Sequence, residues 1–168
     1  MTSVIRFARG TTVAAILIEA LGLGACASKP EGPDANASVA GAATPGSAQD
    51  FVVNVGDRVF FETDSSEVTA QGRETLDKQA QWLTSYAQYA FTVEGHADER
   101  GTREYNLALG ARRAQAARDY LASRGIAPTR MRTISFGKER PVAVCNNISC
   151  WSQNRRAVTV LSAGAPTG

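Results

Sequence analysis

The sequence predicts an α+β fold, a two-layer sandwich in which helices cover one face of a mixed four-stranded sheet. Four short segments are rich in β-branched and aromatic residues, as strands are. Two longer segments between them repeat apolar residues at helical spacing. The order is β-α-β-α-β-β, and strand-helix-strand units imply right-handed crossovers and at least partly parallel pairing. The 168 residues are enough for one domain of ordinary size with appendages.

The first predicted strand and helix come from the segment that begins at Phe51. Residues 51–62 (FVVNVGDRVFFE) have strand composition, which Gly56 and Asp57 interrupt with a turn or bulge. Thr69 is a suitable N-cap for the helix that follows. Apolar residues recur along one face of that helix at Leu76, Ala80, Leu83 and Ala87.

The remaining elements follow in order. Residues 90–96 (AFTVEGH) form the second predicted strand, and a long helix over residues 103–124 ends at Gly125. The last two strands are expected at residues 131–137 and 155–162. The long helix is expected to bury a stripe whose alanines favour close packing on the sheet, consisting of Leu107, Ala111, Ala114, Ala117 and Leu121.

The N-terminal segment has the features of a bacterial lipoprotein signal. Residues 1–25 have a positive start at Arg6 and Arg9 and then a short apolar core. The core ends in LGAC, which resembles a lipobox, so Cys26 is the predicted site of lipid attachment. An ordinary secretory signal with a chance cysteine is the alternative.

Composition then separates a tether from the folded part. Residues 26–49 are rich in Ala, Gly, Pro and Ser and lack large apolar residues, so they cannot bury enough surface to offset chain entropy. We therefore predict a lipidated, flexible tether over 26–49, a folded domain over 50–163 and a short tail over 164–168.

Charge and cysteine content exclude several classes of partner. The net charge of +2, without a basic run, does not favour a nucleic-acid partner. Cys145 and Cys150 remain once Cys26 carries lipid, and an oxidising periplasm favours a disulfide between them. Two thiols make a poor zinc site, so no metal or cofactor is predicted.

Several single residues are assigned structural roles. His96, the chain's single histidine, is predicted to be a packed or hydrogen-bonded residue at a strand end rather than a metal ligand or proton-transfer group. Trp82 and Trp151 are predicted to pack in the core or at an edge. Arg155 or Arg156 is expected to brace a nearby carboxylate.

A candidate ligand site lies in the segment VEGHADERGTREYNLALGARRAQA, residues 93–116. Asn106 and Arg113 are seven residues apart, so they lie on nearly the same helical face. Asp98 lies in the loop that leads to the helix N-terminus, whose free N–H groups attract anions. This combination suits a zwitterion, with an ammonium at Asp98 and a carboxylate at Arg113. The alternative is that Asp98 and Arg113 simply pair with each other.

Longer motifs resemble the OmpA-like peptidoglycan-binding family. They are the segment above, VFFETDSSEVT before it, and SFGKERP and NRRAVTVL after it. The resemblance covers roughly residues 52–161, and the lipobox with its short tether is similar to that of lipoprotein members. It implies the same fold as the element pattern does.

The resemblance also implies roles for individual residues. Asp98 would bind the ammonium of diaminopimelate in the cell-wall stem peptide, and Arg113 would bind its carboxylate. Thr63 stands where relatives usually have an aromatic residue. The other residues that the resemblance places at the pocket are Asn106, Asp64, Arg100 and Thr102.

The function implied by the resemblance is binding without catalysis. An outer-membrane lipoprotein on the periplasmic face would hold peptidoglycan non-covalently, with TolB and the Tol complex as partners in envelope integrity and cell division. One alternative is an OmpA-like lipoprotein outside the Tol system. Another is a wall hydrolase, which one histidine and two bridged cysteines equip poorly.

Overall fold

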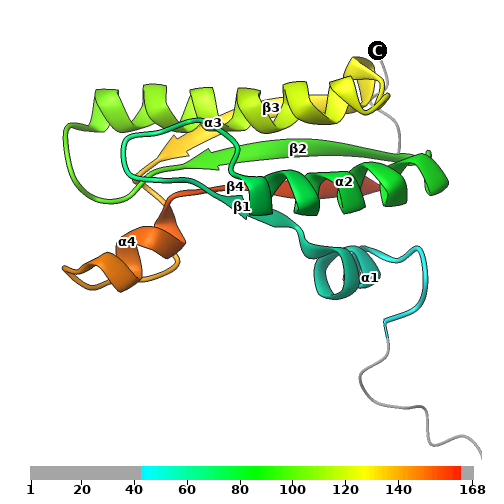
Figure 1. Cartoon of the computed structure of the whole chain (residues 1–168), viewed down its shortest axis with the longest axis horizontal. Coiled ribbons are helices and arrows are strands. Elements are labelled where there is room, and N and C mark those ends of the chain that lie inside the picture. The colour runs from blue at the N-terminus through cyan, green and yellow to red at the C-terminus, as the bar shows by residue number, and fades with distance from the viewer. Residues whose placement is uncertain (1–42, 164–168) are drawn as a thin grey trace, which may run out of the picture. The chain divides into compact units, whose positions relative to one another are not determined.

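The computed structural model describes residues 43–163 of the chain. The predicted signal segment, Cys26, most of the predicted tether and the predicted tail 164–168 lie outside these residues. No helix within the described range is long and apolar enough to cross a membrane. The elements in Figure 1 are α1 (Ala48–Asp50), the π-helical turn η1 (Phe51–Gly56), β1 (Arg58–Phe60), α2 (Ala70–Ser85), β2 (Tyr89–His96), α3 (Arg103–Ser123), the 3₁₀ turn η2 (Pro128–Arg130), β3 (Met131–Gly137), α4 (Ile148–Asn154) and β4 (Arg156–Ala163).

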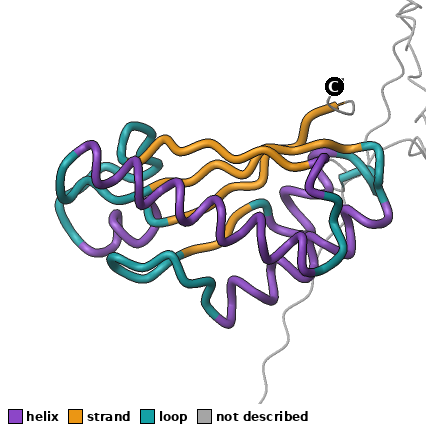
Figure 2. The backbone as a smooth tube through the Cα atoms, turned by 90° about the horizontal axis from the view of Figure 1, so that it is seen from above, coloured by secondary structure: helices purple, strands orange, loops and turns teal. Residues whose placement is uncertain are grey.

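The strands form a mixed sheet in the order β1-β4-β2-β3. β4 pairs antiparallel with both β1 and β2, whereas β2 and β3 run parallel. The strands form one layer and the long helices α2 and α3 a second, as Figure 2 shows. Side chains from both layers make one hydrophobic core, which includes Leu76, Leu83, Val93 and Leu121. The predicted α+β sandwich is therefore confirmed.

The prediction of a strand over residues 51–62 is largely wrong, because Phe51–Gly56 forms the π-helical turn η1. Phe51 is buried, and its ring centroid lies 4.9 Å from that of Trp82 on α2. The Trp82 indole also donates to the Asp50 carboxylate at 2.8 Å. These contacts to α2 outweigh the strand preference of Val52 and Val53, whose side chains are exposed.

The folded part also begins earlier than the predicted boundary at residue 50. Ala48 and Gln49, expected in the tether, belong to α1, and the Ser47 side chain caps that helix. The Tyr89 hydroxyl donates to the Gly46 carbonyl at 2.9 Å, which attaches this segment to β2.

Helix ends follow the predicted local signals. The Thr69 hydroxyl accepts from the Gly72 amide at 3.0 Å and caps α2. Gly125, with a φ of 91°, follows the end of α3 in the left-handed conformation that glycine adopts freely. Ala87 lies beyond the end of α2 and is exposed, so it does not extend the buried face.

The buried face of α3 differs from the predicted alanine stripe in its first half. Ala114, Ala117 and Leu121 are buried, but Ala111 is exposed. Instead, the first half buries Asn106, Leu109, Gly110 and Arg113. The reason is a close approach of the α3 backbone to β2 at Gly110 and Gly95, where a side chain would not fit. This approach turns Arg113 toward the sheet.

The short helix α4, which lies directly before β4, was not predicted. Cys145 and Cys150 form the predicted disulfide. Cys150 lies in the short helix α4, whose start is capped by the Asn147 side chain accepting from the Ser149 amide at 2.9 Å. The disulfide therefore holds the loop before α4 against the helix.

Candidate functional site

A pocket of about 200 Å³ lies where β2 ends and α3 begins. All the sequence-predicted site residues in the domain except Thr102 line it. The Thr102 hydroxyl instead accepts from the Tyr105 amide at 3.2 Å and caps α3, because Thr102 occupies the position just before the first helical turn. The lining residues are Thr63, Asp64, Asp98, Arg100, Gly101, Tyr105, Asn106, Leu109 and Arg113.

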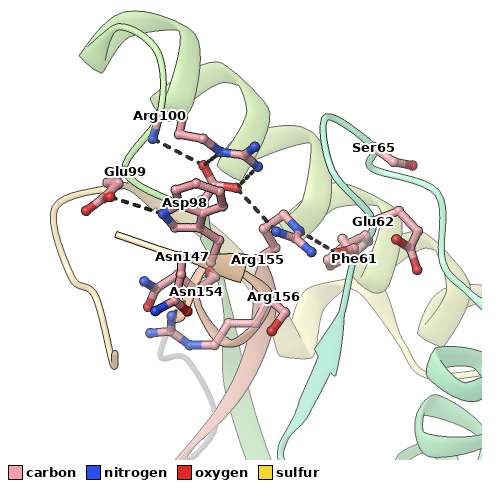
Figure 3. Close-up of polar contacts among 12 residues, drawn as sticks. Phe61, Glu62, Ser65, Asp98, Glu99, Arg100, Asn147, Asn154, Arg155 and Arg156 are labelled. Atoms are coloured by element: carbon pink, nitrogen blue, oxygen red, sulfur yellow. Dashed lines mark hydrogen bonds and ion pairs between the residues drawn. The ribbon is translucent and has the colours of Figure 1, made fainter. Parts of the chain in front are cut away.

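Asp98 is 7% exposed, and its carboxylate is surrounded by donors. Its Oδ1 accepts from the Arg100 amide at 3.1 Å and from Arg100 Nε at 3.0 Å. Its Oδ2 accepts from Arg100 Nη2 at 2.7 Å and from Arg155 Nη1 at 3.4 Å (Figure 3). Burial raises the pKa of Asp98, but the hydrogen bonds and charge of Arg100, assisted by Arg155, outweigh burial and lower this pKa below its usual value. Asp98 is therefore ionised at neutral pH.

Arg113 is 0% exposed, and it donates to main-chain carbonyls rather than to a carboxylate. Its Nε lies 2.8 Å from the carbonyl oxygen of Ser65. Its Nη1 lies 2.9 Å from the carbonyl oxygen of His96, and its Nη2 lies 3.1 Å from that of Glu62. Burial, reinforced by the charge of Arg155, lowers the pKa of Arg113 to about 10, so the guanidinium stays charged at neutral pH. The alternative of a direct pair between Asp98 and Arg113 is wrong, because each has other partners.

Two further contacts order the edge of the pocket. The Tyr105 hydroxyl on α3 donates to the Asp64 carboxylate in the loop before α2, and this bond raises the pKa of Tyr105. Asp64 has a φ of 58°, a left-handed conformation that Asp tolerates better than most residues. Asn106 Nδ2 donates to the Arg100 and Thr102 carbonyls at 2.7 and 3.1 Å, which holds the loop between β2 and α3.

The expectation that Arg155 or Arg156 braces a carboxylate is confirmed for Arg155, whereas the role of Tyr105 was not predicted. Arg155 braces Asp98, whereas Arg156 donates to the carbonyls of Asn154 and Arg140 at 3.3 and 3.2 Å. Tyr105 carried one signal, its place beside Asn106 in the first turn of the long helix. Its partner Asp64 lies 41 positions earlier, so the pairing could not be inferred from spacing.

His96 is a packed residue at the end of β2, as predicted. It is 2% exposed and stacks on Phe136, with 5.6 Å between ring centroids. Among the described residues, both of its ring nitrogens are buried without a hydrogen-bond partner. Burial, followed by the charges of Arg156 and Arg140, lowers the pKa of His96 to about 4. Glu94 lies 3.6 Å from Nε2 and favours protonation, but it does not outweigh these effects.

The depressed pKa of His96 predicts a loss of stability in mild acid. The unfolded chain, with a histidine pKa near 6.5, binds the proton that the folded state disfavours. Stability should therefore fall as the pH drops from about 6.5 toward about 4. Between pH 7 and pH 5 we expect the free energy of unfolding to fall by roughly 2 kcal/mol. Urea unfolding at both pH values measures this change. His96→Gln should remove most of the difference, and an unchanged pH profile in that variant would contradict the assignment.

The mixed sheet with helices on one face, and with charged side chains gathered where β2 meets α3, defines an α+β domain of the OmpA-like fold. The chain belongs to the OmpA family, whose family model matches residues 60–156. The predicted resemblance is thus confirmed.

Several relatives of known name are similar over most of the chain. A peptidoglycan-associated lipoprotein of Rhizobium meliloti (strain 1021) is 68% identical over 148 residues, covering 86% of this chain and 84% of that protein. One of Mesorhizobium japonicum is 66% identical over 149 residues, covering 87% and 89%. The crystal structure of the peptidoglycan-associated lipoprotein from Burkholderia pseudomallei has a TM-score of 0.61 and 43% identity, covering 63% of this chain and 90% of that one. The C-terminal domain of Helicobacter pylori MotB, with a TM-score of 0.59 and 20% identity, shares the fold.

Proposed function

We propose that the chain is an outer-membrane lipoprotein that binds peptidoglycan without catalysis, through the diaminopimelate residue of the stem peptide. The observation that carries this proposal is the pocket, which joins the ionised Asp98 and the charged Arg113 within one small volume. The names of the Rhizobium meliloti and Mesorhizobium japonicum relatives support it, since both are called peptidoglycan-associated lipoproteins.

The chemistry of the pocket suits the free amino-acid end of diaminopimelate. Its ammonium would bind the Asp98 carboxylate through a charge-assisted hydrogen bond. Arg113 has five N–H donors, and three bonds hold it to carbonyls, which leaves donor capacity for a ligand carboxylate. No carboxylate among the described residues forms an ion pair with Arg113, so the ligand would supply its first anionic partner.

The remaining parts of the chain would turn this contact into a link between two layers of the envelope. Lipid on Cys26 would hold the protein in the outer membrane, and the segment between Cys26 and the domain would span toward the wall. Single contacts of modest affinity become firm when many copies act on one polymer. TolB and the Tol complex are the proposed protein partners, by family resemblance, and capture of TolB from envelope extracts tests this assignment.

Substitution at Asp98 is expected to weaken binding of a diaminopimelate-containing tripeptide at least tenfold. Asp98→Asn keeps the shape of the side chain but removes the charge, so the ammonium loses a charge-assisted bond worth roughly 1.5–3 kcal/mol. Isothermal titration calorimetry of both proteins with the tripeptide measures the loss. Asp119→Asn is the matched control, because it makes the same change at an exposed residue further along α3. This variant should bind the tripeptide as tightly as wild type.

Two outcomes would count against the proposal. Unchanged affinity in Asp98→Asn would remove Asp98 from the pocket chemistry. Release of soluble fragments from purified sacculi, rather than co-sedimentation of the protein with them, would favour a hydrolase instead.

A further inference from the structure

The Asp98 carboxylate has no free acceptor position in the structure. A carboxylate offers about four lone-pair sites. The Arg100 amide and Nε occupy those of Oδ1, and Arg100 Nη2 and Arg155 Nη1 occupy those of Oδ2. A ligand ammonium can therefore reach Asp98 only by displacing one of these donors.

Arg100 is the donor that can leave. The Arg155 side chain is 6% exposed, and its Nε also donates to the Phe61 carbonyl at 3.0 Å, so it is fixed in place. The Arg100 side chain is 41% exposed and lines the pocket, and Figure 3 shows its guanidinium beside the Asp98 carboxylate. Its backbone is held independently, because its carbonyl accepts from Asn106 at 2.7 Å. The guanidinium can thus swing away without moving the loop.

Trp151 on α4 provides the surface on which this guanidinium rests. The Arg100 guanidinium carbon lies 4.3 Å from the centre of the Trp151 ring, a cation–π contact. The Trp151 indole donates to the Glu99 carboxylate at 3.0 Å, which fixes the ring beside the pocket loop. Trp151 also follows Cys150 directly, so the disulfide to Cys145 anchors this helix. Trp151 is therefore held in two ways, by the hydrogen bond of its indole and by the disulfide next to it in the chain.

We propose that the Arg100 guanidinium occupies the place of the ligand's ammonium group on Asp98, so that the guanidinium must leave when the ammonium binds. Trp151 is the positioning residue that holds the guanidinium on Asp98. The inference rests on the proposed function, since it needs an ammonium-bearing ligand at Asp98. Two cations cannot share the bidentate face of one carboxylate, so Arg100 competes with the ligand. A ligand without the amine gains nothing when Arg100 is absent.

Removing the competitor should strengthen binding. The Arg100 side chain is 41% exposed in this pair, and ion pairs of exposed side chains are worth up to about 1 kcal/mol, so Arg100→Ala should bind the diaminopimelate tripeptide up to roughly fivefold more tightly. The same tripeptide with its diaminopimelate amine acetylated should show no gain. Arg103→Ala is the matched control. It also removes a positive charge close to the pocket, but Arg103 pairs with Glu139 and not with Asp98. Calorimetric titration of all three proteins with both ligands measures these affinities.

The outcomes separate the inference from the proposed function. Loss of binding in Asp98→Asn together with unchanged or weaker binding in Arg100→Ala would overturn the inference alone. An equal gain for the acetylated ligand would also overturn it. Unchanged binding in Asp98→Asn would overturn the proposed function, and the inference with it.

A double-mutant cycle tests the role of Trp151. Trp151→Ala should tighten binding of the tripeptide by no more than Arg100→Ala does, because the competing guanidinium is then less well positioned. In the Arg100→Ala background the same substitution should have no effect. A change that persists in that background would show that Trp151 supports the pocket in another way.

Discussion

Replacement of Gly95 by alanine is expected to lower the free energy of unfolding by at least about 3 kcal/mol. A Cβ at this position would lie 1.8 Å from the Gly110 carbonyl oxygen and 3.1 Å from the Ala114 Cβ. The first of these is backbone within α3, so it cannot rotate away as a flexible side chain would. The helix would have to move off β2, and the buried contacts between α3 and the sheet would loosen.

Urea unfolding of the purified domain measures this loss. Gly125→Ala is the matched control, since Gly125 has a φ of 91° but no atom within 4 Å of an added Cβ. That variant should lose only about 1–2 kcal/mol through backbone conformation. A Gly95→Ala protein no less stable than Gly125→Ala would show that the close approach of α3 and β2 is not needed.

Arg113→Ala is expected to cost about 3 kcal/mol or more of stability even without a ligand. The substitution removes the Arg113 donor from the carbonyls of Glu62, Ser65 and His96, and a buried group left unsatisfied costs about 1–3 kcal/mol. The Glu62 carbonyl keeps a second donor, the Ser65 amide at 3.3 Å, so the loss falls mainly on the other two carbonyls. Water entering from the pocket would recover part of this loss. Arg112→Ala, on the exposed side of the same helix, should stay within about 0.5 kcal/mol of wild type.

This expectation changes how binding data for Arg113 are interpreted. Arg113 connects α3 to the end of β2 and to the loop before α2, so its removal disturbs both walls of the pocket. A loss of ligand affinity in Arg113→Ala is evidence for a ligand contact only when unfolding measurements show a folded protein at the assay temperature. Wild-type stability in Arg113→Ala would contradict the structural role. Asp98→Asn is the cleaner test, because it keeps the shape of the side chain and removes its charge.

Local sequence signals were sufficient for most of the element order and for the location of the pocket. Thr69 and Gly125 mark helix ends through hydrogen bonding and backbone conformation within one or two turns. Asp98 and Asn106 come together because a short loop joins the end of β2 to α3. The resemblance added Asp64 and Arg100, whose positions in the pocket depend on a second loop and on side-chain conformation.

The partners of these residues were decided by contacts between distant parts of the chain. Asp98 meets Arg155 across 57 positions, and Arg113 meets Glu62 across 51, so neither pairing follows from helical spacing. Phe51 leaves its predicted strand because Trp82 offers a buried site. The order of helices and strands is therefore determined by short-range capping and periodicity. The charges of the pocket residues, and the pairing of Asp98 with Arg100 and Arg155, depend on which side chains tertiary packing brings within hydrogen-bonding distance.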